Sequence, residues 1–365
     1  MMSGLRLRHV TPALAVIAAS TALAGCGILH QHSPIEEAVR FLPRDTTALV
    51  FTDREATAKR LKVDDVSGRD AAAGDVRRYE RAFADQGWGT TQLSPYLSSM
   101  REGPFNELDV RWEVSARWGS GADARTATVW RADDSLDLSA LGHSLTDHGY
   151  HEDTVDGLAR YTVDFRHQAG ADGLVGGLYP SAMTDVLIDS DEHLVVGSQS
   201  GAALADVART AGSSDDSLAD HLGSYESLVD KAGSAEFAAM SAGSGICQEV
   251  TPYGSSKPAT PSPEYAALGH PVARALVATG DPLATINYLE FSSDNAASDD
   301  ATARTRLIRS GDELREGVPF SQLGTFTVSH SGSLVEVSSQ WATGPRAAVS
   351  AELTGGGPAA CLPTG

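Results

Sequence analysis

In the first half of the chain the sequence changes from one hydrophobic periodicity to another, and this change restricts the fold more than any other feature. Apolar residues alternate with polar or charged ones at Val110, Trp112 and Val114, which is the period of a half-buried strand. After a Gly-containing turn, residues 126–130 predict a second strand. Leucines at helical spacing then predict a helix over 138–145. Strands and helices therefore follow one another along the same stretch of chain.

Further helices and strands are predicted on either side of this region. The segment 33–36, Ser-Pro-Ile-Glu, is typical of a helix start, because serine caps, proline suits the first turn and glutamate reaches back to the cap. Pro43 ends this helix. The other helices are expected at 52–61, 69–85, 200–211 and 217–232, and the other strands at 48–51, 161–165, 185–188, 193–197, 286–291, 302–308, 326–328 and 334–338. We therefore predict an α+β fold of antiparallel sheets with the helices packed on one side.

Two parts of the chain carry a similar order of elements. In the first part, a strand, an acidic Gly-containing turn and a second strand lead to residues 131–134. In the second part, strands at 286–291 and 302–308 enclose an acidic turn at 293–300. The chain then continues with the polar residues 309–312. The distance between matching segments shrinks along the chain, so the sequence leaves open whether the two halves are a duplication or are similar by coincidence.

One segment divides the chain by composition. Residues 251–264 are rich in proline and serine, which do not sustain a helix or a central strand, and they predict a linker or a long surface loop. This loop separates a first α+β unit at 34–250 from a second, β-rich unit at 265–365 that packs on the first. About 340 residues follow residue 25, which is enough for a sizeable core.

The N-terminal segment has the features of a targeting signal. Arg6 and Arg8 precede an apolar stretch over 10–22, which is shorter than the ~20-residue helix that spans a membrane. The segment ends in the residues Leu-Ala-Gly-Cys at 23–26. We expect residues 1–25 to be a signal peptide.

The Leu-Ala-Gly-Cys ending resembles the lipobox of bacterial lipoproteins. The resemblance implies cleavage between Gly25 and Cys26, followed by attachment of acyl chains such as palmitate to Cys26. Residues 26–33 would then be a lipidated tether. The mature protein would be anchored to the membrane through the lipid on Cys26, outside the cell on the outer face of the cytoplasmic membrane. The alternative is an ordinary secretory signal followed by an unrelated cysteine.

The mature part resembles a second, broader group of proteins. The Leu-Pro-Arg-Asp-Thr-Thr-Ala-Leu-Val-Phe segment at 42–51, followed by a helix, strands and a hairpin, is similar to exported actinobacterial proteins of unknown function. This resemblance implies an α+β fold and assigns no catalytic residues.

The charge of the chain excludes one class of partner. The sequence contains 28 Lys and Arg against 48 Asp and Glu, a formal charge of −20, and the signal segment 1–25 contributes two arginines and no acid. The mature chain would therefore carry −22. Such a charge keeps a protein soluble and repels nucleic acid and anionic headgroups. We predict that nucleic acid is not a partner.

Two cysteines remain once Cys26 is lipidated, and an extracytoplasmic site permits them to pair. A bridge between Cys247 and Cys361 would hold the C-terminal tail to the segment around Cys247. In the chain-entropy model, closing this loop contributes on the order of 4–5 kcal/mol. Two free thiols are the alternative.

The sequence contains no recognisable catalytic, phosphate-binding or metal-binding motif. Three histidines and three carboxylates lie within residues 143–153, but a helix followed by a glycine would point them in different directions, which argues against a zinc site. His30 and His32 are expected in a solvated linker. The acidic turns at 189–192 and 293–300 lack the spacing of a calcium loop. We therefore predict no catalytic residue, no metal and no cofactor.

The remaining candidates for a binding surface are the tryptophans. Trp112, Trp118 and Trp130 lie in the predicted strands and are expected to pack in the core. The sequence favours a non-enzymatic protein of the cell envelope that binds a partner protein or an envelope polymer, or acts as a structural spacer. A carrier of a lipid or small ligand is the first alternative, and a hydrolase with dispersed catalytic residues is the second.

Overall fold

The structure, a computed structural model, describes residues 33–361 except for 69–70, 101–102, 104, 164–180, 244–245, 248–262 and 281–282. Several residues that the sequence analysis singled out lie outside this part of the chain, namely Gly25, Cys26, His30, His32 and most of the Pro- and Ser-rich segment 251–264.

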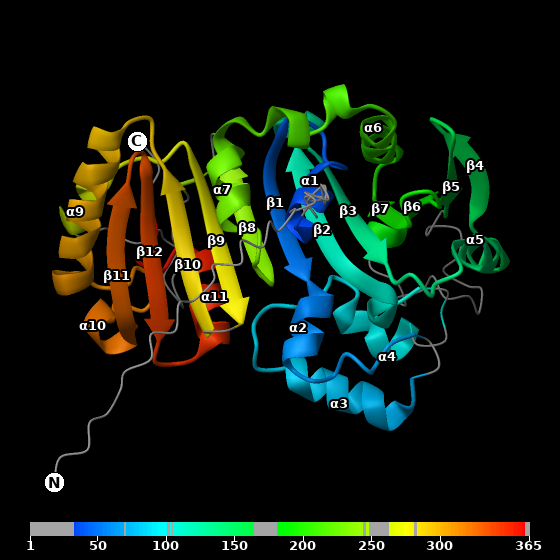
Figure 1. Ribbon diagram of the computed structural model, residues 1–365, viewed down its shortest axis with the longest axis horizontal. Helices are drawn as coiled ribbons and strands as arrows, with labels where there is room; N and C mark the ends of the chain where they lie inside the picture. The colour runs from blue at the N-terminus through cyan, green and yellow to red at the C-terminus, as the bar shows by residue number, and fades with distance from the viewer. Residues whose placement is uncertain are drawn as a thin grey trace, which may run out of the picture. The chain divides into compact units, whose positions relative to one another are not determined.

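The described chain is built on one twelve-stranded sheet, ordered β11-β12-β10-β9-β8-β1-β2-β3-β7-β6-β5-β4 (Figure 1). All neighbouring strands are antiparallel. The α+β class and the antiparallel pairing predicted from the sequence are confirmed. The strands are β1 Thr46–Asp53, β2 Val110–Trp118, β3 Arg125–Ala132, β4 His151–Val155, β5 Leu158–Thr162, β6 Asp185–Asp189, β7 Leu194–Ser198, β8 Phe237–Ala242, β9 Ala273–Gly280, β10 Leu283–Glu290, β11 Gly324–Ser331 and β12 Leu334–Trp341.

The helices cover both faces of this sheet, whereas the sequence analysis expected them on one side (Figure 1). On one face, here the α1 face, α1, α6 and α7 pack over the sheet. On the opposite face, here the α11 face, lie α5, α9 and α11. The helices are α1 Pro34–Val39, α2 Arg54–Arg60, α3 Ala73–Phe83, α4 Leu97–Met100, α5 Leu138–Asp147, α6 Gly201–Gly212, α7 Glu226–Lys231, α8 Pro263–Ala266, α9 Asp294–Ser310, α10 Phe320–Leu323 and α11 Pro345–Leu353.

The reason for two-sided coverage is visible in single strands. In β7, consecutive residues Leu194, Val195 and Val196 are all buried, although they point alternately to the two faces. Leu194 and Val196 belong to the core on the α1 face, and Val195 belongs to the core on the α11 face. A strand with apolar residues on both of its faces must be covered on both sides.

The start of the first helix agrees with its sequence signature. The backbone N–H of Ser33 donates to Oε2 of Glu36 over 2.7 Å, and the N–H of Glu36 donates back to the Ser33 hydroxyl, which forms a capping box. Pro34 occupies the first turn, and the helix ends at Val39, shortly before Pro43. The first helix of the described chain therefore begins at a well-defined residue.

The prediction for residues 293–308 was wrong. The acidic turn and the following strand are a single helix, α9, which begins after its cap Ser293. Asp300 accepts a hydrogen bond of 2.6 Å from Nε of Arg304 one turn later, and both side chains are buried. This stretch contains no proline or glycine before Gly311, so nothing in it interrupts a helix. The second strand–turn–strand motif, on which part of the proposed repeat depended, therefore does not exist.

The predicted helix over 217–232 is also shorter than expected. Only its second half forms α7, and short 3-10 turns precede it. Gly223, with φ of 51°, adopts the left-handed conformation that glycine favours, and it begins the second 3-10 turn, which leads directly into α7.

The cysteine and tryptophan predictions are confirmed. Cys247 and Cys361 form a disulfide that closes a separation of 114 residues, with their Cα atoms 4.8 Å apart. Trp112, Trp118 and Trp130 are buried in the core. Within the part of the chain that the structure describes, every helix is too short or too polar to cross a bilayer.

Candidate functional site

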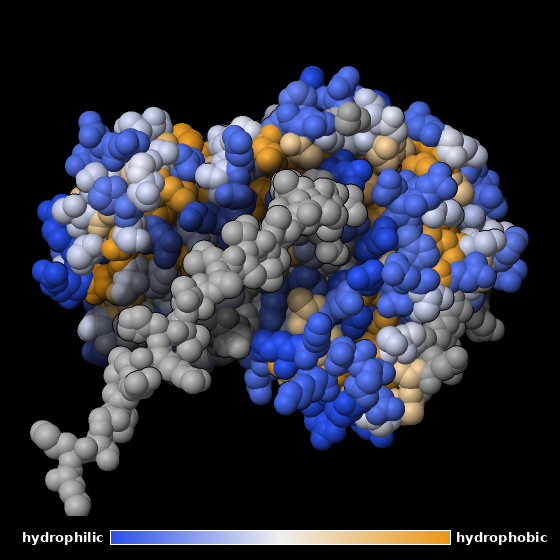
Figure 2. All heavy atoms as spheres, in the orientation of Figure 1, coloured by the Kyte–Doolittle hydropathy of each residue, from blue (hydrophilic) through white to orange (hydrophobic). Residues whose placement is uncertain are grey.

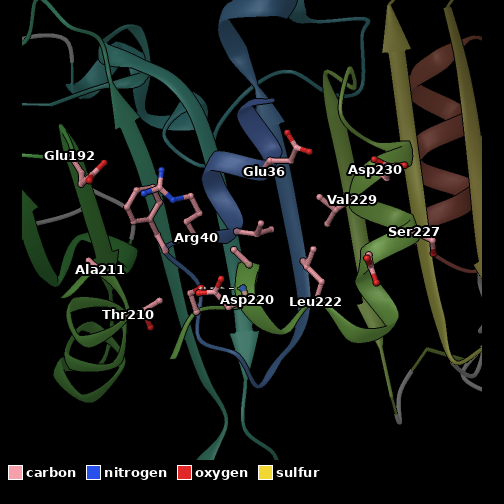
Figure 3. Close-up of a pocket in the computed structure, with 15 residues that line it drawn as sticks. Glu36, Arg40, Glu192, Thr210, Ala211, Asp220, Leu222, Ser227, Val229 and Asp230 are labelled. Carbon is pink, nitrogen blue, oxygen red and sulfur yellow. Dashed lines mark hydrogen bonds between the residues drawn. The ribbon is translucent and has the colours of Figure 1, made fainter. Parts of the chain in front are cut away.

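A hollow of about 760 Å³ lies on the α1 face. Its lining comes from α1, from the end of α6, from the turns that precede α7, and from α7 itself. Figure 3 shows α1 in the middle, with Glu192, Thr210 and Ala211 to one side and Val229 and Asp230 to the other. We refer to this hollow as the α1 pocket.

Segments far apart in the sequence meet to form the α1 pocket. The backbone N–H of Leu218 donates to the carbonyl of Leu42 over 2.7 Å, and the N–H of Arg44 donates to the carbonyl of Asp216 over 3.0 Å. These bonds fasten the chain after α1 to the turns before α7. The pocket therefore depends on long-range pairing and not on one local motif.

The floor of the α1 pocket is apolar. Val39, Phe41 and Val229 are buried and lie beneath the opening, and Leu222 is half-buried beside them. Each belongs to or adjoins the main core cluster, whose helical members come from α1, α6 and α7. The core thus supplies a rigid, water-excluding base for any molecule that enters.

The rim of the α1 pocket is strongly acidic. Five carboxylates line it, against one basic residue, Arg40; the acids are Glu36, Glu192, Asp220, Glu226 and Asp230. Glu36 is engaged in the capping box, and Asp220 accepts a hydrogen bond of 3.2 Å from the Ser217 hydroxyl. Among the described residues, no ion pair involves the other three acids.

The arginine on the rim does not neutralise these acids. The guanidinium carbon of Arg40 lies 5.9 Å from the ring centroid of Phe41, within the range of a cation–π contact. Figure 2 shows many hydrophilic residues on the visible part of this side of the molecule, for example over α2 and α3. The pocket therefore combines an apolar floor with a net negative rim.

Buried carboxylates lie elsewhere in the molecule and do not line the α1 pocket. Burial raises the pKa of Glu113 to about 8, although its Oε2 accepts hydrogen bonds from the N–H of Gln92 and from the indole of Trp130. Burial likewise raises the pKa of Glu107, which accepts from Tyr79 over 2.8 Å. These groups fix the loop around Gln92 onto the sheet, which is a structural role.

The pKa of a third buried carboxylate, that of Glu236, shifts in the opposite direction because a cation faces it. Burial opposes ionisation of Glu236, but hydrogen bonds from Arg60 and Trp88 outweigh it and lower its pKa. The Arg60 Nε donates to Oε1 over 2.7 Å, and the Trp88 indole donates to Oε2 over 3.0 Å. This pair joins α2 to the start of β8.

The histidine-rich stretch does not form a metal site in the structure. His143 is exposed on α5, and His151 is exposed in β4. His148 caps the end of α5, where its Nδ1 lies 2.6 Å from the carbonyl oxygen of Ser144. In the described ranges, no three His, Cys, Asp or Glu side chains come together in a way that suits a metal ion. The acidic turn at 189–192 is a hairpin tip, as expected, in which Asp189 accepts two backbone hydrogen bonds.

The α1 pocket was not predicted from the sequence. Glu36 was identified only as a capping residue and Glu192 only as part of an acidic turn, and the acids Asp220, Glu226 and Asp230 were not singled out. Glu226 and Asp230 lie four residues apart in α7, so their shared face was the one local signal available.

Comparison with known proteins gives no family. No protein-family model and no curated protein matches the chain. Crystal form I of TP0453 is similar with a TM-score of 0.40 and 10% identity, covering 89% of this chain and 99% of that chain. Crystal form III of TP0453 gives a TM-score of 0.39 and 9% identity, covering 86% and 97%. These values are too low to support an inference about fold or function.

Proposed function

We propose that this chain is a lipid-anchored protein outside the cytoplasmic membrane that binds a small organic cation in the α1 pocket without transforming it. The lipobox-like ending at Cys26 supports the anchor. The capping box at Ser33 supports a short tether, because the intervening chain reaches at most ~25 Å. The pocket would then lie on the helix that directly follows the membrane attachment.

The acidic rim over an apolar floor is the observation that carries the proposed ligand class. Five carboxylates and one arginine surround a hollow of about 760 Å³, which is within the usual size of small-ligand sites. A cation with an aliphatic body would place methylene groups on Val39 and Leu222 and its charges among the acids. An anion would be repelled by the rim and by the net charge of −20.

The composition of the pocket supports binding rather than catalysis. A serine hydroxyl is commonly activated by a histidine base, and none of the described residues that line this pocket is a histidine; the Ser217 hydroxyl donates to Asp220 over 3.2 Å. Burial raises the pKa of Glu113 to about 8 and that of Glu352 to about 7, and neither carboxylate is part of the pocket lining. The rim acids therefore serve as electrostatic contacts in this proposal.

Calorimetric titration of the full chain with spermidine, as a model polycation, tests the ligand class. We expect one binding site, and we expect the triple variant Asp220→Asn, Glu226→Gln, Asp230→Asn to bind at least tenfold more weakly. The matched control is Glu80→Gln, Asp147→Asn, Asp299→Asn, which removes the same charge from exposed positions outside the pocket. Equal weakening by both triple variants would show diffuse attraction to an acidic surface and would contradict the proposal.

A further inference from the structure

A row of directly opposed residues crosses the α11 face of the sheet. Successive register partners run from β9 through β8, β1, β2 and β3 to β7, and they are Leu276, Ala239, Val50, Ser115, Thr128 and Gly197. Neighbouring strands lie ~4.8 Å apart, so this row is about 24 Å long. The row runs across the strands. Its middle residues, Ala239, Val50 and Ser115, form the floor of what we call the trough, whereas Leu276, Thr128 and Gly197 toward its ends are buried.

The middle of the trough is uncovered. Val50, in a central strand, is 41% exposed, although its neighbours Leu49 and Phe51 on the opposite face are 1% exposed. The core clusters of α5 and of α11 lie on either side of it. Leu353, at the end of α11, is 49% exposed and lines the same trough.

Two hollows meet in the trough. One, of about 230 Å³, lies toward α11 and is lined by Leu276, Leu353 and Cys361. The other, of about 340 Å³, lies toward Gln92 and Gly197. Both include residues 48–50 in their lining, so they adjoin each other at Val50.

Small side chains at Ala239 and Ser115 keep the middle of the trough open. At the end of the row, Gly197 is buried beneath the Trp130 ring and the Ala182 backbone. A Cβ on Gly197 would lie 2.7 Å from the Trp130 ring and 2.5 Å from the carbonyl oxygen of Ala182, so only glycine allows this close packing at the end of the row. The trough is thus built from the sheet itself.

The charge of the trough is the opposite of that of the chain. Among the described residues that line the two hollows there is no Asp or Glu, and there are two arginines, Arg117 and Arg274. Arg117 is exposed and, within the described chain, makes no ion pair. Arg274 lies under α11, where it donates to the carbonyl of Glu352 over 3.4 Å. Because this lining contains two arginines and no acid, the trough selects an anionic or neutral occupant despite the formal charge of −20 on the whole chain.

We propose that the trough binds a single-chain anionic amphiphile, with its acyl chain over Val50, Ala239 and Leu353 and its acidic headgroup at Arg117. The polar half of the row suits such a headgroup. The Gln92 side-chain nitrogen lies 2.5 Å from the Ser115 hydroxyl, and Ser115 and Thr128 hydroxyls lie 2.9 Å apart, so hydroxyl and amide groups adjoin the arginine.

An acyl chain fits this floor better than an extended peptide. All six strands of the row are paired on both sides, so their backbone groups are already hydrogen-bonded. A peptide lying across them would leave its own N–H and C=O groups without partners over Val50, Ala239 and Leu276. A hydrocarbon chain has no such groups, and burial of each of its methylenes is favourable. This site lies on the opposite face from the α1 pocket and is independent of it.

Displacement of a fluorescent fatty acid from the full chain carrying Cys26→Ser tests this inference, with palmitate as the competitor. We expect palmitate to bind with one site, Val50→Glu to weaken it at least tenfold, and Ala239→Leu, which fills the floor without adding charge, to weaken it in the same direction. Val272→Glu is the matched control, because Val272 is 39% exposed and lies outside the trough. Unfolding temperatures and circular dichroism of each variant check that the fold is retained.

The headgroup assignment has its own test. Arg117→Gln should weaken palmitate three- to tenfold and leave hexadecanol unchanged, whereas Arg117→Lys should restore palmitate binding. Failure of palmitate to bind would overturn the inference, and so would equal binding of hexadecyltrimethylammonium, or an equal loss in Val272→Glu. None of these three outcomes would affect the spermidine experiment, which reports on the α1 pocket.

Discussion

The indole Nε1 of Trp130 donates a hydrogen bond of 2.6 Å to Oε2 of Glu113, and the two residues are direct register partners in β2 and β3. The same carboxylate oxygen accepts the backbone N–H of Gln92 over 2.9 Å. No ion pair compensates Glu113 among the described residues, and burial raises its pKa to about 8. The protonated form is therefore favoured in the folded protein at neutral pH.

This relationship predicts a pH dependence of stability. Because the pKa of Glu113 is about 8 in the folded chain and lower in the unfolded chain, the contribution of this group is complete below about pH 4.5 and is lost as the pH rises to 8. The loss approaches ~1.4 kcal/mol for each pH unit in that window. Glu113→Gln, which keeps one acceptor oxygen for both donors, should match the wild type at pH 5 and be more stable at pH 8.

Urea unfolding at pH 5, 6, 7 and 8 measures the effect. The exposed substitution Glu80→Gln is the control and should leave the pH profile of the wild type unchanged. Parallel profiles for Glu113→Gln and the wild type would show that Glu113 is ionised in the fold and would contradict this prediction.

The disulfide should contribute a large part of the stability. Replacing both Cys247 and Cys361 by alanine opens a loop of 114 residues, and we expect the free energy of unfolding to fall by on the order of 4 kcal/mol. Arg304 still donates to the carbonyls of Pro358 and Ala360, so the folded state should persist. Urea unfolding of the oxidised protein and of the double variant measures this change. A difference in the free energy of unfolding below ~1 kcal/mol would mean that Arg304 alone holds residues 358–360 in place.

The ion pair between α2 and β8 offers a test of a buried charge. Glu236→Ala leaves Arg60, which is 22% exposed, without its partner, and should cost roughly 2–3 kcal/mol of stability. The pKa of Glu236 is lowered, so its contribution is present above its ordinary pKa and is lost as the pH falls below it. The penalty of Glu236→Ala should therefore shrink toward pH 3. Thermal unfolding from pH 7 to pH 3 follows it, and a penalty that is constant over this range would contradict the assignment.

The anchor is tested by one substitution in the native host. Cys26→Ala removes the acceptor of the acyl chains, so we expect the protein to leave the membrane fraction and appear in the soluble extracytoplasmic fraction. Cys361→Ala, which leaves the lipidation position unchanged, is the control for effects of cysteine loss. Continued tight membrane association of Cys26→Ala would exclude lipidation as the anchor.

Local signals predicted the elements whose structure is local. Ser33 and Glu36 define the start of α1 within four residues, and the alternation from Val110 to Val114 defines β2. The acidic residues after Ser293 led to the wrong prediction of a turn. In the structure, alanines and the Asp300–Arg304 ion pair stabilise a helix there.

The two candidate sites could not be predicted because each depends on long-range pairing. The α1 pocket requires the bond from Leu218 to Leu42, and the trough requires the register that places Val50 between Ala239 and Ser115. A shift of one residue would turn Val50 to the opposite face. No pattern within a single segment of the sequence encodes these registers.

Hydrogen exchange of the full chain, with and without saturating spermidine, tests the central claim most directly. The account predicts slower exchange for backbone amides in α1 and over residues 219–231, which surround the α1 pocket, and unchanged exchange in α11 and in the floor of the trough. Protection spread evenly over acidic surfaces, or no protection around the pocket, would contradict a binding site there.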